Sequence, residues 1–425
     1  MMEFVSRLKT HGERCVPPTE TIARLEAFVG SRHDFWIHEE SVSPDLHWAA
    51  MFLEGLEFRS MGKGTTLEAA RAGALAEGAE WLASRATGDL PGYTWGRQED
   101  FPNALRLEDL LGHVANANPS LVRRLQALEV AGHWVDGCSL IDGSPVKVPL
   151  EYVRLISGPN GKASGNSLEE AVIHAAYEIL ERRVHITVLR NRMPMPTIDP
   201  STISLPVVRR QMEFLQGKGI EFTIKDLSLG GALPCLGVYF RDTTIPQDFQ
   251  FHHFFKVGTS FDLEEALVRA FTEYTQGRKA TEFLDPNAPD YSNRLATLLD
   301  HDFRRIGTLG NDCDNFMSAF MFGMVPYRNA DFLLEGDIVP FHAGVRHADC
   351  LDDIAAAKDA FTSLGLNLIA VDLTDPAIGF PVVQLIAPGY SDVLPYHPPN
   401  SPTLFRPVTR TEVLESYPSL PTFIK

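Results

Sequence analysis

Three segments of this 425-residue chain carry largely polar side chains at matching positions. They are, in chain order, Gly73, Glu77 and Glu80; His174, Glu178 and Glu181; and Arg269, Glu273 and Gln276. Each set is spaced i, i+4 and i+7, which places its members on one side of a helix. Converging carboxylates repel one another unless a cation lies among them, and Mg²⁺ suits oxygen ligands and phosphates. The alternative is three helices whose Glu residues face water, but the matched register favours convergence.

Three helices must position these side chains. Each begins at a residue that can cap a helix N-terminus, namely Thr66, Ser167 and Asp262. Glu170 and Glu265 stand where a capping box places its acid. Apolar residues then recur at helical spacing, which predicts helices over 66–81, 167–182 and 262–277. Their many alanines indicate close packing on neighbouring backbone inside a domain.

Composition restricts the kind of protein this is. The chain is 44% hydrophobic and 22% charged, which is typical of a folded soluble protein. Its net charge of −17 argues against nucleic-acid or anionic-membrane partners, which require a positive surface. The length fits about three domains or one large mixed domain.

The N-terminus shows no signal peptide and no apolar run approaches a membrane span. The five cysteines stand far apart, as expected of reduced thiols and not of a disulfide framework or a zinc site. We therefore expect a cytoplasmic protein.

The three helix segments lie within motifs that resemble the signatures of the YcaO family. The first signature is resembled by the run Gly62-Lys63-Gly64-Thr65 together with Glu77 and Glu80. The second is resembled by Ser164-Gly165-Asn166 together with Glu178, Glu181 and Arg182. The third is resembled by Gly258 and Ser260 together with Arg269, Glu273, Gln276 and Arg278. Between the last two, the run from Lys225 to Gly231 resembles a strand-and-turn segment of the family. The likeness extends from near Arg14 to about Pro399.

The resemblance implies a mixed α/β (α+β) fold of the YcaO type, with three related helix motifs packed on sheet. It also implies a nucleotide site without a P-loop, and the sequence indeed contains no G-x-x-x-x-G-K-[ST] run. We expect a single unit over 1–425 with a core over 57–400. Residues 87–162 are a possible subdomain, and 400–425 form a proline-containing tail.

The resemblance implies ATP and Mg²⁺ as cofactors and assigns residues to them by motif position. The metal ligands are Glu77, Glu80, Glu178 and Glu181. The nucleotide-binding residues are Arg14, Thr21, Lys63, Asn166, His174, Arg182, Ser260, Arg269, Glu273, Gln276 and Arg278. The implied reaction is phosphorylation of a backbone amide oxygen of a peptide or protein, after a nucleophile adds to the carbonyl carbon.

The pattern is most similar to the stand-alone bacterial branch, which is associated with methylthiolation of a ribosomal protein beside a radical methylthiotransferase. Thioamidation or support of methylthiolation is therefore the expected outcome. Azoline formation is an alternative, although the chain ends in Pro421-Thr-Phe-Ile-Lys425 and not in the P-x-P-x-P tail of azoline-forming members. The expected partners are a peptide or protein substrate, a sulfur donor or methylthiotransferase, and a second copy in a homodimer.

Two residues depart from the first signature. Gly73 stands where the family normally has Ser, and Trp81 stands where it has Arg. Both positions adjoin the expected metal ligands, and an indole supplies no cation. These departures motivate a further alternative, a non-catalytic nucleotide-binding scaffold.

Overall fold

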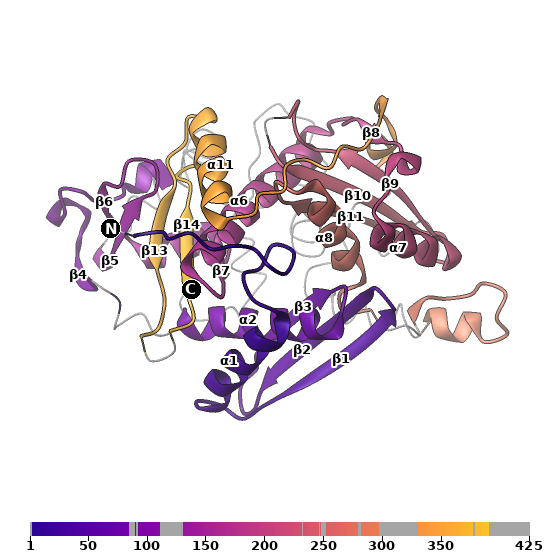
Figure 1. The fold of residues 1–425 in the computed structure, drawn as a ribbon, viewed down its shortest axis with the longest axis horizontal. Coiled ribbons are helices and arrows are strands. Elements are labelled where there is room, and N and C mark those ends of the chain that lie inside the picture. The colour runs from indigo at the N-terminus through magenta and orange to yellow at the C-terminus, as the bar shows by residue number, and fades with distance from the viewer. Residues whose placement is uncertain are drawn as a thin grey trace.

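The computed structural model describes residues 2–84, 90, 92–110, 131–231, 233–245, 247, 252–278, 282–296, 330–376 and 379–390. In this part of the chain the strands form three sheets, and helices lie between them (Figure 1). The expected tail 400–425 lies outside the described residues. Nowhere in the described ranges is a helix both long and apolar enough to span a membrane.

The first sheet comes from the N-terminal part of the chain. Its antiparallel strands are β1 (Phe35–Ser43), β2 (Leu46–Leu53) and β3 (Arg59–Gly64), in that order. The helices α1 (Pro18–Gly30) and α2 (Leu67–Ala83) pack on it (Figure 1). Trp48 and Ala50 of the central strand face the other way, into a core shared with the third predicted helix. The central strand is therefore buried on both faces.

The second sheet has the order β11-β10-β9-β8-β12. These strands are β8 (Thr197–Ile198), β9 (Ile220–Asp226), β10 (Cys235–Asp242), β11 (His253–Thr259) and β12 (Ile338–Val339). The helices α7 (Pro206–Gly217) and α8 (Leu263–Thr275) pack against it. The run from Lys225 to Gly231 holds the end of β9 and the turn that follows it, and β9 and β10 pair antiparallel as a hairpin. Gly230 and Gly231 have positive φ, of 82° and 89°, which few other residues adopt.

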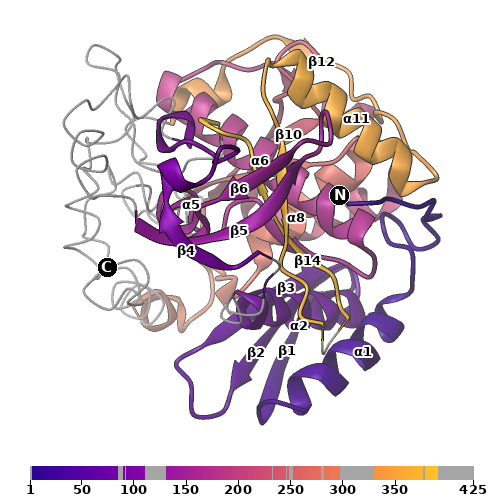
Figure 2. The same cartoon turned by 90° about the vertical axis from the view of Figure 1, so that its left-hand side faces the viewer.

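The third sheet joins distant parts of the chain, in the order β4-β5-β13-β14-β7 with β6 beside β5 (Figure 2). Its strands are β4 (Thr94–Arg97), β5 (Ala131–Ser139), β6 (Pro145–Val148), β7 (Lys162–Ser164), β13 (Ile369–Asp372) and β14 (Val382–Ile386). The two C-terminal strands, β13 and β14, pair antiparallel with each other. The described part of region 87–162 supplies β4, β5 and β6, so it shares this sheet with the C-terminal strands.

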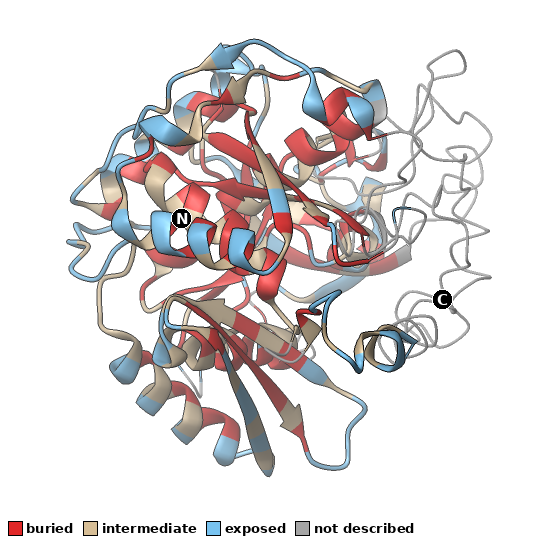
Figure 3. Cartoon of the chain, turned by 90° about the vertical axis from the view of Figure 1, so that its right-hand side faces the viewer, coloured by how far each residue is buried: buried red, intermediate tan, exposed pale blue. Residues whose placement is uncertain are grey.

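The remaining elements complete the layers. They are α5 (Leu150–Ser157), α6 (Leu168–Asn191), α11 (Cys350–Ser363) and the short 3-10 helices η2 (Gln98–Asp100), η3 (Pro200–Thr202) and η7 (Asp331–Leu334). Buried residues concentrate where helices and sheets face each other, and exposed residues lie on outward turns (Figure 3). The mixed α/β architecture expected from the sequence is therefore present.

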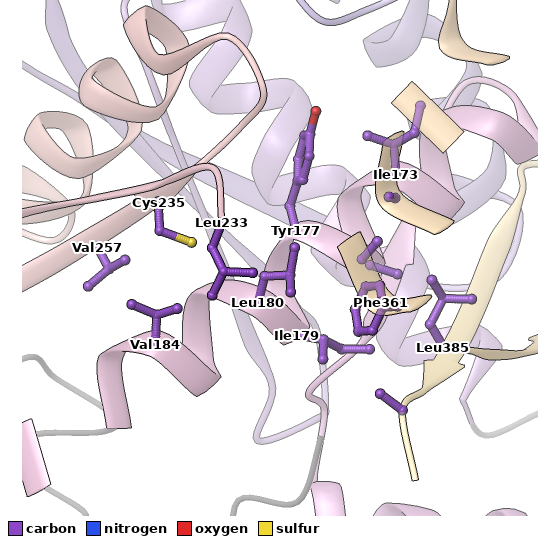
Figure 4. Packing of buried hydrophobic residues seen from close by; sticks show 14 of the residues in the cluster. Ile173, Tyr177, Ile179, Leu180, Val184, Leu233, Cys235, Val257, Phe361 and Leu385 are labelled. Atoms are coloured by element: carbon purple, nitrogen blue, oxygen red, sulfur yellow. The ribbon is translucent and has the colours of Figure 1, made fainter. Parts of the chain in front are cut away.

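Helix α6 lies at the centre of the largest core. Tyr177, Leu180 and Val184 point into a cluster that also holds Val257 of β11 and Phe361 of α11 (Figure 4). None of its described side chains between residues 168 and 189 is exposed. A helix with no exposed side chain along this length packs on the surrounding sheets and fixes them relative to one another.

A strand, a short turn and a helix recur as β3–α2, β7–α6 and β11–α8. The predicted caps are confirmed, since Thr66, Ser167 and Asp262 each accept a hydrogen bond from a backbone N–H of the first turn. The capping-box interpretation of Glu170 is wrong: its carboxylate accepts hydrogen bonds from the N–H of Asn166 at 2.8 Å and of Cys15 at 2.5 Å. Glu170 thus joins the second motif to the N-terminal segment.

Glycines allow strand and helix to approach in two of these units. A Cβ on Gly62 would lie 2.0 Å from the carbonyl oxygen of Ala70, and one on Gly258 would lie 1.9 Å from that of Ala266. Both are four residues before the helix cap. The alanine-rich helix faces therefore pack directly on strand backbone, as the composition of the helices predicted.

Gly258→Ala should destabilise the fold, because its methyl group would force β11 away from α8. Overpacking of a core usually costs about 1–3 kcal/mol, and a backbone clash should fall at the upper end. Gly217→Ala is the matched control, since no atom lies within 4 Å of a Cβ at that position. Urea unfolding followed by circular dichroism measures both. Equal midpoints for Gly258→Ala and the unmodified protein would show that the strand and helix are not in close contact.

Candidate active site

A cavity of about 620 Å³ lies where the three strand–turn–helix units and the N-terminal segment meet. Its walls come from α2, α6 and α8, from the turns that precede them and from residues 11–21. The predicted site residues that line it are Arg14, Thr21, Lys63, Asn166, His174, Glu181, Arg269, Glu273 and Gln276. Each of the three matched sets of side chains, called stripes below, thus has members at one cavity, although the sets are far apart in the sequence.

Cations gather on one side of this cavity. Lys63 forms an ion pair with Glu273, and the ammonium of Lys256 lies 3.9 Å from the same carboxylate. Burial lowers the pKa of Lys63 to about 8, and nearby Arg269 and Arg182 contribute. Lys63 lines the cavity, and 32% of its side-chain surface is exposed. Burial and the neighbouring Lys63 lower the pKa of Lys256 to about 7.

Arg269 connects α8 to α6 and to the N-terminal segment. Its Nη2 donates to Oε2 of Glu13 at 2.7 Å and to Nδ1 of His174 at 3.0 Å. Burial, and then the charges of Arg14 and Arg269, lower the pKa of His174 well below its usual value. His174 is therefore neutral at pH 7 and accepts a hydrogen bond in this arrangement. Ser260 also donates to the Glu13 carboxylate.

Three predicted metal ligands lie just behind the cavity wall, where they hold strands to helices. Glu77 accepts a hydrogen bond from the N–H of Met61 at 2.6 Å, and Glu178 accepts one from Gly161 at 3.0 Å. Glu80 accepts from both the N–H and the hydroxyl of Ser164, each at 2.8 Å. Within the described residues no group of three or more His, Cys, Asp or Glu side chains is gathered tightly enough to hold a metal.

These carboxylates nevertheless have the electrostatics of a cation site. Burial raises the pKa of Glu77, Glu80 and Glu178, that of Glu80 to about 7. Glu77 and Glu178 raise the pKa of Glu80 further, and Glu181 raises that of Glu178. Four acids that repel one another, all with oxygen donors, match the ligand chemistry of Mg²⁺. The donor set therefore fits the implied metal.

Two other predicted residues are placed differently. Arg182 lies 3.7 Å from Glu178, next to the carboxylates and behind the cavity wall. Arg278 points away from the cavity: it donates to Asp242 at 3.0 Å and to the Tyr274 hydroxyl at 2.6 Å. Its guanidinium also covers the ring of Phe283 at 4.2 Å. In this conformation Arg278 joins α8 to β10.

The departures from the first motif have a physical explanation. A Cβ on Gly73 would lie 3.2 Å from the Cα of Gly62, so the strand leaves little room there. Trp81 stacks on Phe58, with ring centroids 4.1 Å apart, and packs beside an apolar cluster. Trp81 therefore contributes apolar packing and not a positive charge. Lys256 and Lys162 supply positive charges near the site that the motifs did not indicate.

Sequence reasoning did not identify Glu13, Lys256, Lys162 or Glu265 as site residues. Lys256 gave a signal, since it is a charged residue within the apolar strand β11. Lys162 precedes the second motif, and its pKa is lowered by burial, although Glu80 favours its charge. Glu13 gave no signal, because only the fold brings the N-terminal segment to α8.

The comparisons with known proteins agree with this arrangement. The family model described as YcaO cyclodehydratase, ATP- and Mg²⁺-binding, matches residues 61–391. An uncharacterized protein of Methanothermobacter thermautotrophicus is 28% identical over 157 residues, which cover 34% of this chain and 40% of that protein. The Escherichia coli ribosomal protein S12 methylthiotransferase accessory factor YcaO is 28% identical over 138 residues, or 32% of this chain and 23% of that protein. The chain therefore matches less than half the length of these relatives.

Solved structures share the fold. A heterocyclase in complex with substrate and cofactor has a TM-score of 0.69 at 17% identity, covering 92% of this chain and 54% of that one. YcaO from Methanopyrus kandleri, bound with AMPPCP and Mg²⁺, has a TM-score of 0.62 at 19% identity, covering 91% of this chain and 95% of that one. With the family model spanning most of its length, this chain belongs to the YcaO family of ATP- and Mg²⁺-binding proteins.

Proposed function

We propose that this protein uses ATP and Mg²⁺ to activate the oxygen of a backbone amide in a peptide or protein substrate. The product is a thioamide, or the activation supports methylthiolation of a ribosomal protein. One observation carries the proposal: three matched helix stripes line a single cavity with cations on one side and buried carboxylates behind it. This arrangement serves a metal-bound polyanion better than an uncharged ligand.

The residues of the cavity take distinct roles in this proposal. Bound ATP supplies the phosphoryl group that makes the amide oxygen a leaving group, with Mg²⁺ balancing its charge. Lys63, Lys256 and Arg269 stabilise negative charge on the transferred group. The neutral His174 keeps Arg269 oriented through its 3.0 Å hydrogen bond.

The remaining predicted residues bind the cofactors. Glu77, Glu80, Glu178 and Glu181 would hold the metal, and the first three now accept hydrogen bonds from the backbone N–H groups of Met61, Ser164 and Gly161. Arg14, Thr21 and Asn166 line the same cavity, and the Thr21 hydroxyl donates to Asn166 at 2.8 Å. By binding the nucleotide there, Arg14, Thr21 and Asn166 would fix its position relative to Lys63. Arg278 would act indirectly, by holding α8 on β10.

The name of the Escherichia coli relative supports a link to ribosomal-protein methylthiolation. Azoline formation is the main alternative, favoured by the cyclodehydratase description of the family model. The heterocyclase neighbour, at 17% identity, supports the fold alone. The scaffold alternative follows from Trp81, which supplies no cation. Lys63 and Arg269 line the cavity, and Lys256 lies beside them, 3.9 Å from Glu273. These cations favour an enzyme. A homodimer and a sulfur-donating or methylthiotransferase partner remain predictions.

Product analysis tests the proposed reaction. The protein is incubated with Mg²⁺, ATP, sulfide and purified small-subunit ribosomal proteins, and mass spectrometry follows the replacement of a backbone oxygen by sulfur. ADP should form together with the sulfur-containing product. Loss of water from a Cys, Ser or Thr residue, without sulfur, would point to azoline formation. ATP that stays intact with every substrate would favour the scaffold.

Glu178→Gln should weaken Mg²⁺-dependent ATP binding, because an amide keeps the shape of the side chain but lacks the negative charge. Even loss of an outer-shell partner of a metal costs about 10–100-fold in affinity, so we expect at least that loss here. Glu68→Gln, an exposed residue at the start of α2, is the matched control and should bind as the unmodified protein does. Isothermal titration calorimetry measures both. Unchanged affinity in Glu178→Gln would remove Glu178 from the metal site.

ATP binding near pH 8 should take up protons. The pKa of Lys63 is about 8 and that of Lys256 about 7 in the free protein, and a polyphosphate beside them would raise both values. Affinity should then fall as the pH rises above about 8, because the bound state holds more protons. Calorimetry in two buffers of different ionisation enthalpy measures the uptake, which Lys256→Met should reduce. Proton release on binding would contradict the role of these lysines.

A further inference from the structure

The N-terminal strap, residues 2–16, runs beside α11 and then reaches the cavity (Figures 1 and 2). The Lys9 ammonium lies 2.6 Å from Asp353 of α11, and the N–H of Arg7 donates to Asp349 at 3.1 Å. Farther on, the N–H of Cys15 donates to Glu170 of α6. The strap is therefore attached on both sides of the turn that enters the cavity.

That turn places charged groups in the cavity. Gly12 has a positive φ of 61°, and the N–H of Thr10 donates to the carbonyl of Arg14 at 2.9 Å, which closes a tight loop. Glu13 at its tip pairs with Arg269 and accepts from Ser260. Any anion that binds Arg269 must compete with this carboxylate.

Two thiols meet where the strap passes α11. The sulfur of Cys15 lies 3.6 Å from that of Cys350, the first residue of α11. Cys350 is 0% exposed, whereas Cys15 is half-buried and can meet a reagent from solution. A disulfide has an S–S distance of about 2.05 Å, so the sulfurs need to close by roughly 1.5 Å. Among the described cysteines, Cys235 instead contacts the Thr259 hydroxyl at 3.1 Å.

We propose that Cys15 and Cys350 are a redox modification site at which a low-molecular-weight disulfide, such as oxidised glutathione, converts the two thiols into a disulfide. The thiolate of Cys15 attacks the small disulfide, forms a mixed disulfide and releases one small thiol. The thiolate of Cys350 then attacks the Cys15 sulfur and releases the second. Two protein thiols are oxidised, one small disulfide is reduced to two thiols, and the two protein protons leave with them.

The disulfide acts on the cavity through the strap. Cys15 is two residues from Glu13, so a covalent bond to α11 holds the Glu13 carboxylate against Arg269. With both thiols free, the loop can move away from α8 when an anion enters. This consequence rests on the proposed function, since it takes the cavity to bind polyphosphate; the formation of the disulfide does not.

Mass spectrometry tests the modification itself. The purified protein is incubated with oxidised glutathione, alkylated and digested. Alkaline buffer speeds both steps, since burial and Glu170 raise the pKa of Cys15 to about 11, and burial also raises the pKa of Cys350. The expected product is a peptide linking Cys15 to Cys350, without retained glutathione. Cys350→Ser should retain glutathione on Cys15, and Cys138→Ser should link as the unmodified protein does. Persistent glutathione on Cys15 of the unmodified protein, or two thiols that stay free, would overturn the proposal.

Calorimetry with Mg²⁺ and inorganic triphosphate tests the consequence. The oxidised protein should bind about fivefold more weakly than the reduced protein, the lower end of usual coupling between sites. Glu13→Gln should remove the difference between the two forms. Equal affinities of both forms of the unmodified protein would overturn the role of the strap. Triphosphate that binds neither form, although the disulfide is present, would count against the proposed function and leave the modification established.

Discussion

The placing of many charges around one partly buried cavity is the constraint on which the rest of the structure depends. Burial disfavours every charge there, which is why the pKa values of lysines fall and those of carboxylates rise. The protein compensates with internal pairs, Lys63 with Glu273 and Arg269 with Glu13. A metal-bound polyanion would take the place of both carboxylates, Glu273 beside Lys63 and Glu13 beside Arg269. The free protein is thus organised around a ligand of complementary charge.

The fold meets this constraint by bringing three helix starts to one place. Glycines remove the side chains that would separate β3 from α2 and β11 from α8, as the 2.0 Å and 1.9 Å distances show. Helix α6 supplies the rigid centre, because its described side chains face core or cavity along most of its length. Glu77 of α2 and Glu178 of α6 accept hydrogen bonds from the backbone of Met61 and Gly161, so the predicted metal ligands also hold helices to strands behind the cavity wall.

Much of this arrangement could be predicted from local pattern. The caps Thr66, Ser167 and Asp262 and the matched stripes placed three helices in register, and this required only helical periodicity. Long-range contacts could not be predicted in the same way. Glu13 reaches Arg269 across 256 positions of sequence, and Cys15 meets Cys350 across 335. No spacing rule connects such residues.

The direction in which each side chain points could not be predicted from the sequence either. Arg278 shares a motif with Arg269, yet helix α8 ends at Thr275 and leaves Arg278 facing Asp242. Glu170 stands in a capping-box position but bonds to the N-terminal strap, because that segment offers a second N–H. In both cases the side chain also binds a residue that is distant in the sequence. The motifs thus predict which residues lie near the same cavity more reliably than they predict the hydrogen-bond partner of each residue.

The most direct test of the account is calorimetric titration of ATP into the purified protein, with and without Mg²⁺. Carboxylates behind a cation-lined cavity predict tight binding with Mg²⁺ and much weaker binding without it. Equal affinity in both conditions would contradict the assignment of the carboxylates to a metal. No binding in either condition would contradict the nucleotide site itself.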